Sequence, residues 1–315
     1  MKILHIFASA LLAILSLSLL SSCNTDSDEK NNSIVDLATY NLYTDSSNGD
    51  VIGIKPAVYR FGLYFTSNTI DITTNSMKVS GETTASFSTE RMPFSYKSFM
   101  VGSFNREIIS FHNSAPATQG ASVANLNGRI TQAYNLILDI PVPGYNIEVA
   151  VNSLHNVVMQ YTLNNNINVR TFWRDVTFCG MTSVKSNSDL LTSYSNSKIS
   201  YRVAMHCDKE SNILDKADLI IYNLALTDKA LPKTVVIKDV DLKFGAFGYE
   251  VSGKNLKVLA ISTSGQELVE DDSILFDNFY LSTTPDMTGA NITYKVNGEF
   301  SGACMGYCEV QENTL

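Results

Sequence analysis

The stretch KISYRVAMH, from Lys198 to His206, alternates between polar and apolar side chains with a period of two. Successive side chains of a β-strand point to opposite faces, whereas a helix repeats about every 3.6 residues. One face of this segment carries four apolar side chains: Ile199, Tyr201, Val203 and Met205. The opposite face carries Lys198, Ser200, Arg202 and His206. The stretch therefore predicts a strand with one buried face.

The same alternation recurs along the chain. Clear further examples are residues 134–140, 145–151, 220–226 and 240–244. Helix caps followed by a 3.6-residue apolar period are hard to find anywhere in the sequence. Many short strands at a spacing of roughly 8 to 12 residues are typical of sandwiches and barrels. The sequence therefore predicts an all-β protein with an antiparallel β-sandwich or barrel-like architecture.

A predicted hairpin divides the chain into two tandem β domains. Pro143-Gly144 separates two alternating segments, which is the pattern of two strands joined by a turn. We place the domain boundary just after this hairpin, near Asn152. This gives an N-terminal β domain over residues 34–152 and a C-terminal β domain over residues 153–315. A single continuous sandwich is the alternative.

The N-terminus has the pattern of a secretory signal. Lys2 supplies a positive charge, a run of apolar and small residues extends to Leu20, and a polar segment begins directly after Cys23. A run of this length could also form a membrane-spanning helix. Several serines dilute it, however, and no basic cluster follows it. We therefore expect a signal peptide over residues 1–22, lipidation of Cys23 and a polar leash over residues 23–33.

The segment Leu20-Ser21-Ser22-Cys23, followed by the acidic Asp26, Asp28 and Glu29, resembles the signal and export tag of all-β surface lipoproteins of Bacteroidetes type. This resemblance implies a palmitate-type anchor on Cys23. It also implies an outer-membrane location with the domains facing the cell surface. Beyond residue 33 the resemblance is one of general style, so it assigns no functional residues.

Charge and motifs exclude several classes of ligand. The chain has a formal net charge of −8, and no cluster of Lys and Arg is available to neutralise phosphates. We therefore expect no nucleic-acid partner. Glycine-rich phosphate loops and dinucleotide fingerprints are also absent from the sequence, so we expect no cofactor.

Four cysteines remain in the chain after lipidation of Cys23: Cys179, Cys207, Cys304 and Cys308. An even number of cysteines in an exported chain favours disulfides, with three possible connectivities. The simplest pairs Cys179 with Cys207 and Cys304 with Cys308. A metal site is the alternative, because the run Met205-His206-Cys207 together with Met305 offers soft ligands suited to copper. Four-ligand zinc spacing is not present, so we expect no metal.

Aromatic and basic residues near position 172 are the best candidates for ligand binding. Phe172 and Trp173 lie between Arg170 and Arg174 in a segment, Val169 to Phe178, that we expect to be one strand. Neighbouring side chains of a strand point to opposite faces. If Phe172 is buried, Trp173 is therefore exposed and could stack on a sugar ring, with the two arginines beside it. The alternative is that these aromatics belong to the core.

No catalytic constellation is evident in the sequence. There is no G-x-S-x-G elbow, and the densest acidic cluster consists of Glu270, Asp271, Asp272 and Asp277. We expect a membrane-tethered extracytoplasmic lipoprotein that binds glycan or protein at the cell envelope and is not an enzyme. One alternative is a structural envelope or adhesin subunit. Another is a hydrolase that uses the acidic residues near 270–277.

Overall fold

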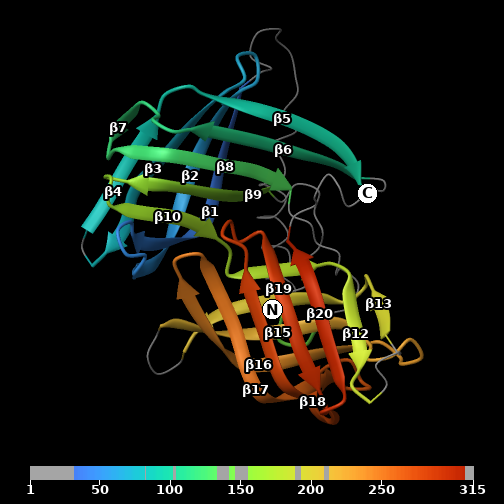
Figure 1. Ribbon diagram of the computed structural model, residues 1–315. Helices are drawn as coiled ribbons and strands as arrows, with labels where there is room; N and C mark the ends of the chain where they lie inside the picture. The colour runs from blue at the N-terminus through green and yellow to red at the C-terminus, as the bar shows by residue number, and fades with distance from the viewer. Residues whose placement is uncertain are drawn as a thin grey trace, which may run out of the picture.

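The computed structural model describes residues 32–81, 83–101, 104–132, 142–145, 155–188, 193–208 and 213–308. These residues form β-strands and connecting turns without any helix, which confirms the predicted all-β class. Two antiparallel sheets account for all the described strands, and Figure 1 shows them as two bodies, blue to green above and yellow to red below.

The first sheet contains β1 (Asn32–Asp45), β2 (Val51–Tyr64), β3 (Thr69–Ser80), β4 (Thr83–Thr89), β5 (Met92–Val101), β6 (Phe104–Asn113), β7 (Thr118–Gly120), β8 (Val123–Gln132), β9 (His155–Leu163) and β10 (Ile167–Phe172). The second sheet contains β11 (Asp175–Cys179), β12 (Thr182–Ser186), β13 (Ser193–Asn196), β14 (Ser200–Cys207), β15 (Leu214–Leu224), β16 (Lys233–Gly245), β17 (Gly248–Ile261), β18 (Leu268–Thr283), β19 (Gly289–Val296) and β20 (Phe300–Tyr307).

Strand pairing closes each sheet on itself. In the first sheet β2 pairs with both β1 and β3, which completes the ring β2-β1-β10-β9-β8-β6-β5-β3. In the second sheet β11 pairs with both β14 and β20, which completes the ring from β14 through β15 to β20. Closure removes the unpaired edges that an open sheet exposes. We call the two rings, with their attached short strands, the N-terminal barrel (β1–β10) and the C-terminal barrel (β11–β20).

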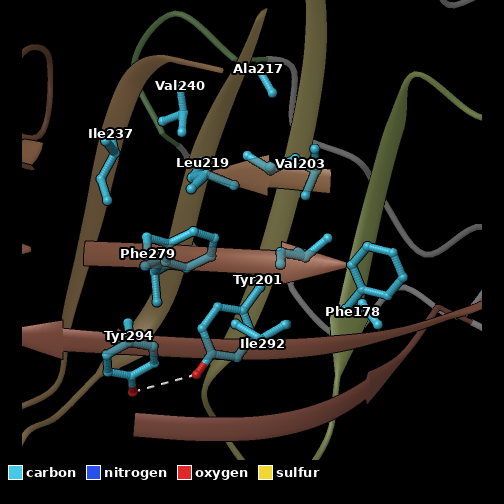
Figure 2. Packing of buried hydrophobic residues seen from close by; sticks show 14 of the residues in the cluster. Phe178, Tyr201, Val203, Ala217, Leu219, Ile237, Val240, Phe279, Ile292 and Tyr294 are labelled. Atoms are coloured by element: carbon cyan, nitrogen blue, oxygen red, sulfur yellow. Dashed lines mark hydrogen bonds between the residues drawn. The ribbon is translucent and has the colours of Figure 1, made fainter. Parts of the chain in front are cut away.

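Alternating side chains fill the interior of each barrel. In β14, the inward residues are those expected from the sequence pattern, and Tyr201 and Val203 are fully buried. Figure 2 shows Tyr201 beside Tyr294 of β19, with their hydroxyls 3.5 Å apart. Arg202 points to the opposite face and is also buried. Its ion pair of 2.6 Å with Asp175 compensates for the burial of its charge. The predicted strand is therefore confirmed, but both of its faces are largely covered.

The N-terminal barrel holds a polar cluster at the centre of its apolar core. Asn41 is fully buried and donates hydrogen bonds of 2.8 Å to the hydroxyls of both Tyr43 and Tyr59. The Tyr59 hydroxyl lies 2.9 Å from that of Tyr161, which donates to the sulfur of Met77. Burial raises the pKa of Tyr43 to about 12, so this hydroxyl stays protonated. Each buried polar group in this Asn41 cluster thus has a partner.

The chain passes from one barrel to the other at Trp173 and Arg174. Strand β10 ends at Phe172 and β11 begins at Asp175, so the single strand expected over residues 169–178 is interrupted there. The boundary expected near Asn152 falls too early. Strands β9 and β10 lie beyond it in the sequence but pair with β8 and β1 of the N-terminal barrel. A predicted hairpin shows where the chain turns, but the strands that follow the turn can still belong to the same sheet.

The predicted hairpin is only partly within the described residues. A turn is present at Pro143-Gly144, where the Tyr145 amide donates to the Val142 carbonyl at 3.0 Å. Residues 133–141 and 146–154, which include most of both predicted strands, lie outside the described residues. The turn itself packs on the C-terminal barrel, because Val142 lies in a cluster with Ile220 and Val236.

Aromatic side chains join the two barrels. Phe172 of β10 packs 6.0 Å from Tyr40 of β1 and 5.1 Å from Phe244 of β16, measured between ring centroids. Leu42, which points outward from β1, is fully buried within the core cluster of the C-terminal barrel. The outer face of the N-terminal barrel therefore completes the core of its neighbour.

Candidate functional site

A cavity of about 140 Å³ lies between the two barrels, and we call it the junction cavity. Its floor is the outer face of strands β6, β8, β9 and β10, and its far wall is the loop after β18. The residues that line it are Ser110, Asn127, Gly128, Arg129, Val158, Met159, Gln160, Arg170, Thr171, Pro285 and Asp286.

Strand register brings the polar residues of the cavity into two rows. Asn127 pairs with Gln160, which in turn pairs with Arg170, so one row crosses β8, β9 and β10. Ser110 pairs with Arg129 in the adjacent row. Directly opposed side chains on one face of a sheet lie about 5 Å apart. The two rows therefore present hydroxyl, amide and guanidinium groups to a single small space.

Each arginine of the cavity also contacts the C-terminal barrel. Arg170 donates a hydrogen bond to the carbonyl of Ala246, and its guanidinium lies 5.8 Å from the centre of the Phe247 ring. Burial lowers the pKa of Arg170. A guanidinium is charged at neutral pH. Arg129 approaches the Asp286 carboxylate at 3.7 Å.

The Asp286 carboxylate is held in place by its own loop. It accepts hydrogen bonds from the hydroxyls of Thr284 at 2.6 Å and Thr288 at 2.8 Å. Burial by itself would raise the pKa of Asp286, but these hydrogen bonds and Arg129 outweigh it and hold that pKa below its usual value. The cavity thus contains two fixed positive charges and one fixed negative charge.

A second, narrower cavity lies next to the junction cavity and is lined by Trp173, and we call it the extension. This space measures about 10 Å³, close to the smallest volume that holds one water molecule. Tyr249 lines it and is buried, and its hydroxyl has no hydrogen-bond partner among the described residues. Burial raises the pKa of Tyr249 well above its usual value, so the hydroxyl keeps its proton. Val158, Thr171 and Asp286 line both spaces.

The three residues predicted to bind ligand have different places in the structure. Arg170 lines the junction cavity, and Trp173 lines its extension. Trp173 is partly buried against the C-terminal core, so it does not form an exposed platform on a strand face. Arg174 donates hydrogen bonds to the Met205 carbonyl at 3.2 Å and to the Tyr40 hydroxyl at 3.0 Å. It fastens the two barrels together.

The structure contains no disulfide bond between the four cysteines Cys179, Cys207, Cys304 and Cys308, so the predicted disulfides are not found. Cys304 and Cys308 are four residues apart along β20 and its end, which separates their Cα atoms by about 13 Å. Cys179 lies opposite Ser200 at one end of β14, whereas Cys207 lies at the other end. A disulfide requires Cα atoms within about 7 Å. Extended backbone therefore keeps both expected pairs too far apart.

The acidic residues near 270–277 are engaged in local contacts on β18. Asp271 forms an ion pair of 2.7 Å with Lys233, and Glu270 forms one of 3.3 Å with Lys257. The Lys233 ammonium and the Ser273 hydroxyl lower the pKa of Asp271. Asp277 accepts a hydrogen bond from the Gly298 amide at 2.6 Å. Three of the four predicted carboxylates thus form ion pairs or hydrogen bonds that stabilise the sheet at its surface.

The soft copper ligands are not brought together. Met205 points into the C-terminal core, whereas His206 lies on the opposite face of β14. His206 instead meets two carboxylates, with its Nε2 atom 3.3 Å from Asp218 and 3.5 Å from Asp239. These three residues form the one group among the described residues with the proximity that a metal site requires.

Asp218 is the centre of this group, which we call the Asp218 cluster. It accepts hydrogen bonds from the Tyr145 hydroxyl at 2.6 Å, from Lys238 at 2.9 Å and from the Asp239 amide at 3.0 Å. Burial would raise the pKa of Asp218, but these donors outweigh it and hold the pKa below its usual value. The Lys238 ammonium balances the buried charge, and the cluster joins the turn at Tyr145 to the C-terminal barrel.

A β-bulge assembles the Asp218 cluster. Pairing between β15 and β16 shifts register between Ala217 and Leu219, so that Lys238 and Asp239 both lie opposite Asp218. Asp239 adopts a positive φ of 54°, as the extra residue of a bulge often does. In the sequence this extra residue appears as a break in the alternation, because Lys238 and Asp239 are two consecutive polar residues between the buried Ile237 and Val240.

None of the described residues forms a helix with the length and apolar character needed to cross a membrane. The chain matches no protein-family model, no curated protein and no solved structure.

Proposed function

We propose that this chain is an extracytoplasmic lipoprotein that binds a glycan through a single sugar ring held in the junction cavity. The observation that carries the proposal is the convergence of two arginines, two amides and a serine on one small space between the two barrels. Sugars are recognised by hydrogen bonds to their hydroxyls, and charged donors form the stronger of these bonds.

The size of the cavity supports one ring and no more. A protein cavity of about 150 Å³ accommodates a benzene ring of six carbon atoms, and the junction cavity is similar at about 140 Å³. A hexose has twice as many heavy atoms as benzene, so the cavity can take up one sugar ring only in part. Its lining differs from an apolar cavity, because most of the side chains that define it are polar. A terminal sugar residue fits this description better than an internal segment of a polysaccharide.

The alternative of a structural envelope subunit has less support. Such a subunit would pair an exposed sheet edge with another chain. The strands that end the two sheets are β7 with three residues and β13 with four. Edges this short offer few backbone groups for pairing. The fold therefore favours binding through the cavity over assembly through an edge.

Affinity electrophoresis through gels that contain different polysaccharides tests the glycan proposal. The chain from residue 24 onward includes every described residue and is the form to use. We expect one or more polysaccharides to retard it, and we expect Arg170→Ala to reduce the affinity tenfold to a hundredfold, roughly the value of a charged hydrogen bond. Arg60→Ala is the matched control, because Arg60 is an exposed arginine outside the cavity lining.

Two outcomes would contradict the glycan proposal. The first is that no polysaccharide in the panel retards the chain. The second is that Arg170→Ala and Arg60→Ala retain equal affinity for a polysaccharide that does. Either result would favour a protein partner as the ligand, and pull-down from the envelope would identify that partner.

Lipid anchoring is the second part of the proposal and rests on Cys23, which lies outside the described residues. Acyl chains on this residue would hold the barrels at the outer membrane, with the leash as a spacer. We expect Cys23→Ala to move the protein from the membrane fraction to the soluble fraction. Incorporation of a labelled fatty acid into the wild-type protein, but not into the variant, would support the proposal. A variant that stays in the membrane would refute lipidation as the anchor.

A further inference from the structure

We infer that the sugar bound in the junction cavity carries a carboxylate, as a uronic acid does. This inference rests on the proposed function and adds the chemical class of the ligand. It depends on the charge of the cavity, on the environment of Arg170 and on the geometry of the row that contains Arg170.

The junction cavity has the opposite charge to the chain as a whole. Its charged lining consists of Arg129, Arg170 and Asp286, which gives a formal charge of +1. The whole chain carries −8. A neutral sugar would need no such local excess of positive charge. An anionic ligand would be attracted to this site and repelled by much of the remaining surface.

Arg170 is partly buried, and the described residues place no carboxylate in an ion pair with it. Its contacts on the C-terminal barrel are the Ala246 carbonyl and the Phe247 ring, both of which are neutral. Burial lowers the pKa of Arg170, as expected when a cation is held partly out of water. Partial burial of a charge is unfavourable unless the charge is paired. A ligand carboxylate would supply the missing anion, and the lower dielectric would strengthen the contact.

The neighbours of Arg170 are suited to the rest of a uronic acid. Gln160 lies directly opposite Arg170, and Asn127 lies opposite Gln160 on the other side. A guanidinium can bind a carboxylate with two parallel hydrogen bonds. The two amides can then donate to and accept from ring hydroxyls, because each amide offers both kinds of group. The row thus matches a ring with a carboxylate at one end and hydroxyls along its length.

The test is calorimetric titration of the chain from residue 24 onward with galacturonic acid and glucuronic acid. The comparison ligands are the methyl esters of both sugars, together with galactose and glucose. The ester removes the negative charge and keeps the ring, so the comparison does not depend on any variant being folded. We expect each acid to bind tenfold to a hundredfold more tightly than its ester. Arg170→Gln should remove this preference, and Arg60→Gln should leave it unchanged.

A uronate-ended oligosaccharide, titrated alongside the free acids, distinguishes a polysaccharide end from a free sugar acid as the source of the ligand. Equal binding of acids and neutral sugars, with both reduced by Arg170→Gln, would overturn this inference and leave the glycan proposal standing. A preference for acids that Arg170→Gln does not change would also overturn it. Failure of every sugar and polysaccharide to bind would contradict both.

Discussion

Asp218→Ala is expected to lower the free energy of unfolding by about 3 kcal/mol. The substitution leaves three donors without their acceptor: the Tyr145 hydroxyl, the Lys238 ammonium and the Asp239 amide. Each such hydrogen bond contributes about 1 kcal/mol, and a buried donor without a partner carries a further penalty. Urea-induced unfolding of the variant and of the wild type measures the difference.

The matched control for Asp218→Ala is Asp241→Ala, two positions along β16 from Asp239. Asp241 forms an ion pair of 2.6 Å with Lys216, but 61% of its side chain is exposed. Exposed ion pairs contribute little, so we expect a change below about 0.5 kcal/mol. Equal effects of the two substitutions would show that the Asp218 cluster is no more than a surface ion pair.

The contribution of Asp218 should also depend on pH. The pKa of Asp218 in the folded protein lies below its usual value of about 4, so the ionised form favours folding. Its contribution is therefore fully present above the unfolded pKa and is lost as pH falls through about 4 and below. Between pH 7 and pH 3 the wild type should lose more stability than Asp218→Ala does. Parallel losses in the two proteins would contradict this assignment.

Asn41→Ala is expected to destabilise the N-terminal barrel by about 3 kcal/mol or more. Asn41 donates to the Tyr43 and Tyr59 hydroxyls, and its carbonyl oxygen accepts from Tyr59 at 3.0 Å. All three side chains are fully buried, so no water can replace the lost amide without entering the core. The substitution combines lost hydrogen bonds with a small cavity, and both terms are unfavourable. Thermal unfolding followed by circular dichroism measures the change.

Tyr161→Phe provides a graded comparison for Asn41→Ala. It removes a single hydroxyl from the edge of the cluster, where that hydroxyl contacts Tyr59 and Met77, and it keeps the ring. We expect a loss of about 1 kcal/mol. If Asn41→Ala is no more harmful than Tyr161→Phe, the Asn41 cluster does not hold the barrel together as we describe.

The sequence predicted strands well because burial imposes a period of two. The segment from Lys198 to His206 is the clearest case, and its apolar face lies in the core as expected. The same logic could not find Asn41 or Asp218. Each is a polar residue at a buried position, where it depends on hydrogen bonds to side chains of other strands or turns. Asp218, for example, depends on Tyr145 of a distant turn and on a bulge at Asp239.

The candidate site was only partly predictable, for a related reason. Arg170 and Trp173 stood out as unusual residue types in one short segment. Asn127 and Gln160 did not, because they reach the cavity through the pairing of β8, β9 and β10. Ring closure of the two sheets also depends on pairings between strands far apart in sequence. The cysteine prediction was wrong because an even number of cysteines indicates disulfides only from composition. The extended strands hold the expected pairs too far apart to form them.

Fluorescence of Trp173 during titration with a glycan tests whether the junction cavity is the binding site. Trp173 is the single tryptophan of the chain and lines the extension of the junction cavity, so its emission reports on this place. We predict a saturable change in emission when a polysaccharide that retards the chain, or its terminal sugar, is added. Arg170→Ala should abolish the change at the same concentration, and Arg60→Ala should preserve it. The contrary result is a glycan that binds without changing the emission of Trp173 and that binds Arg170→Ala as tightly as the wild type. This result would place the site elsewhere.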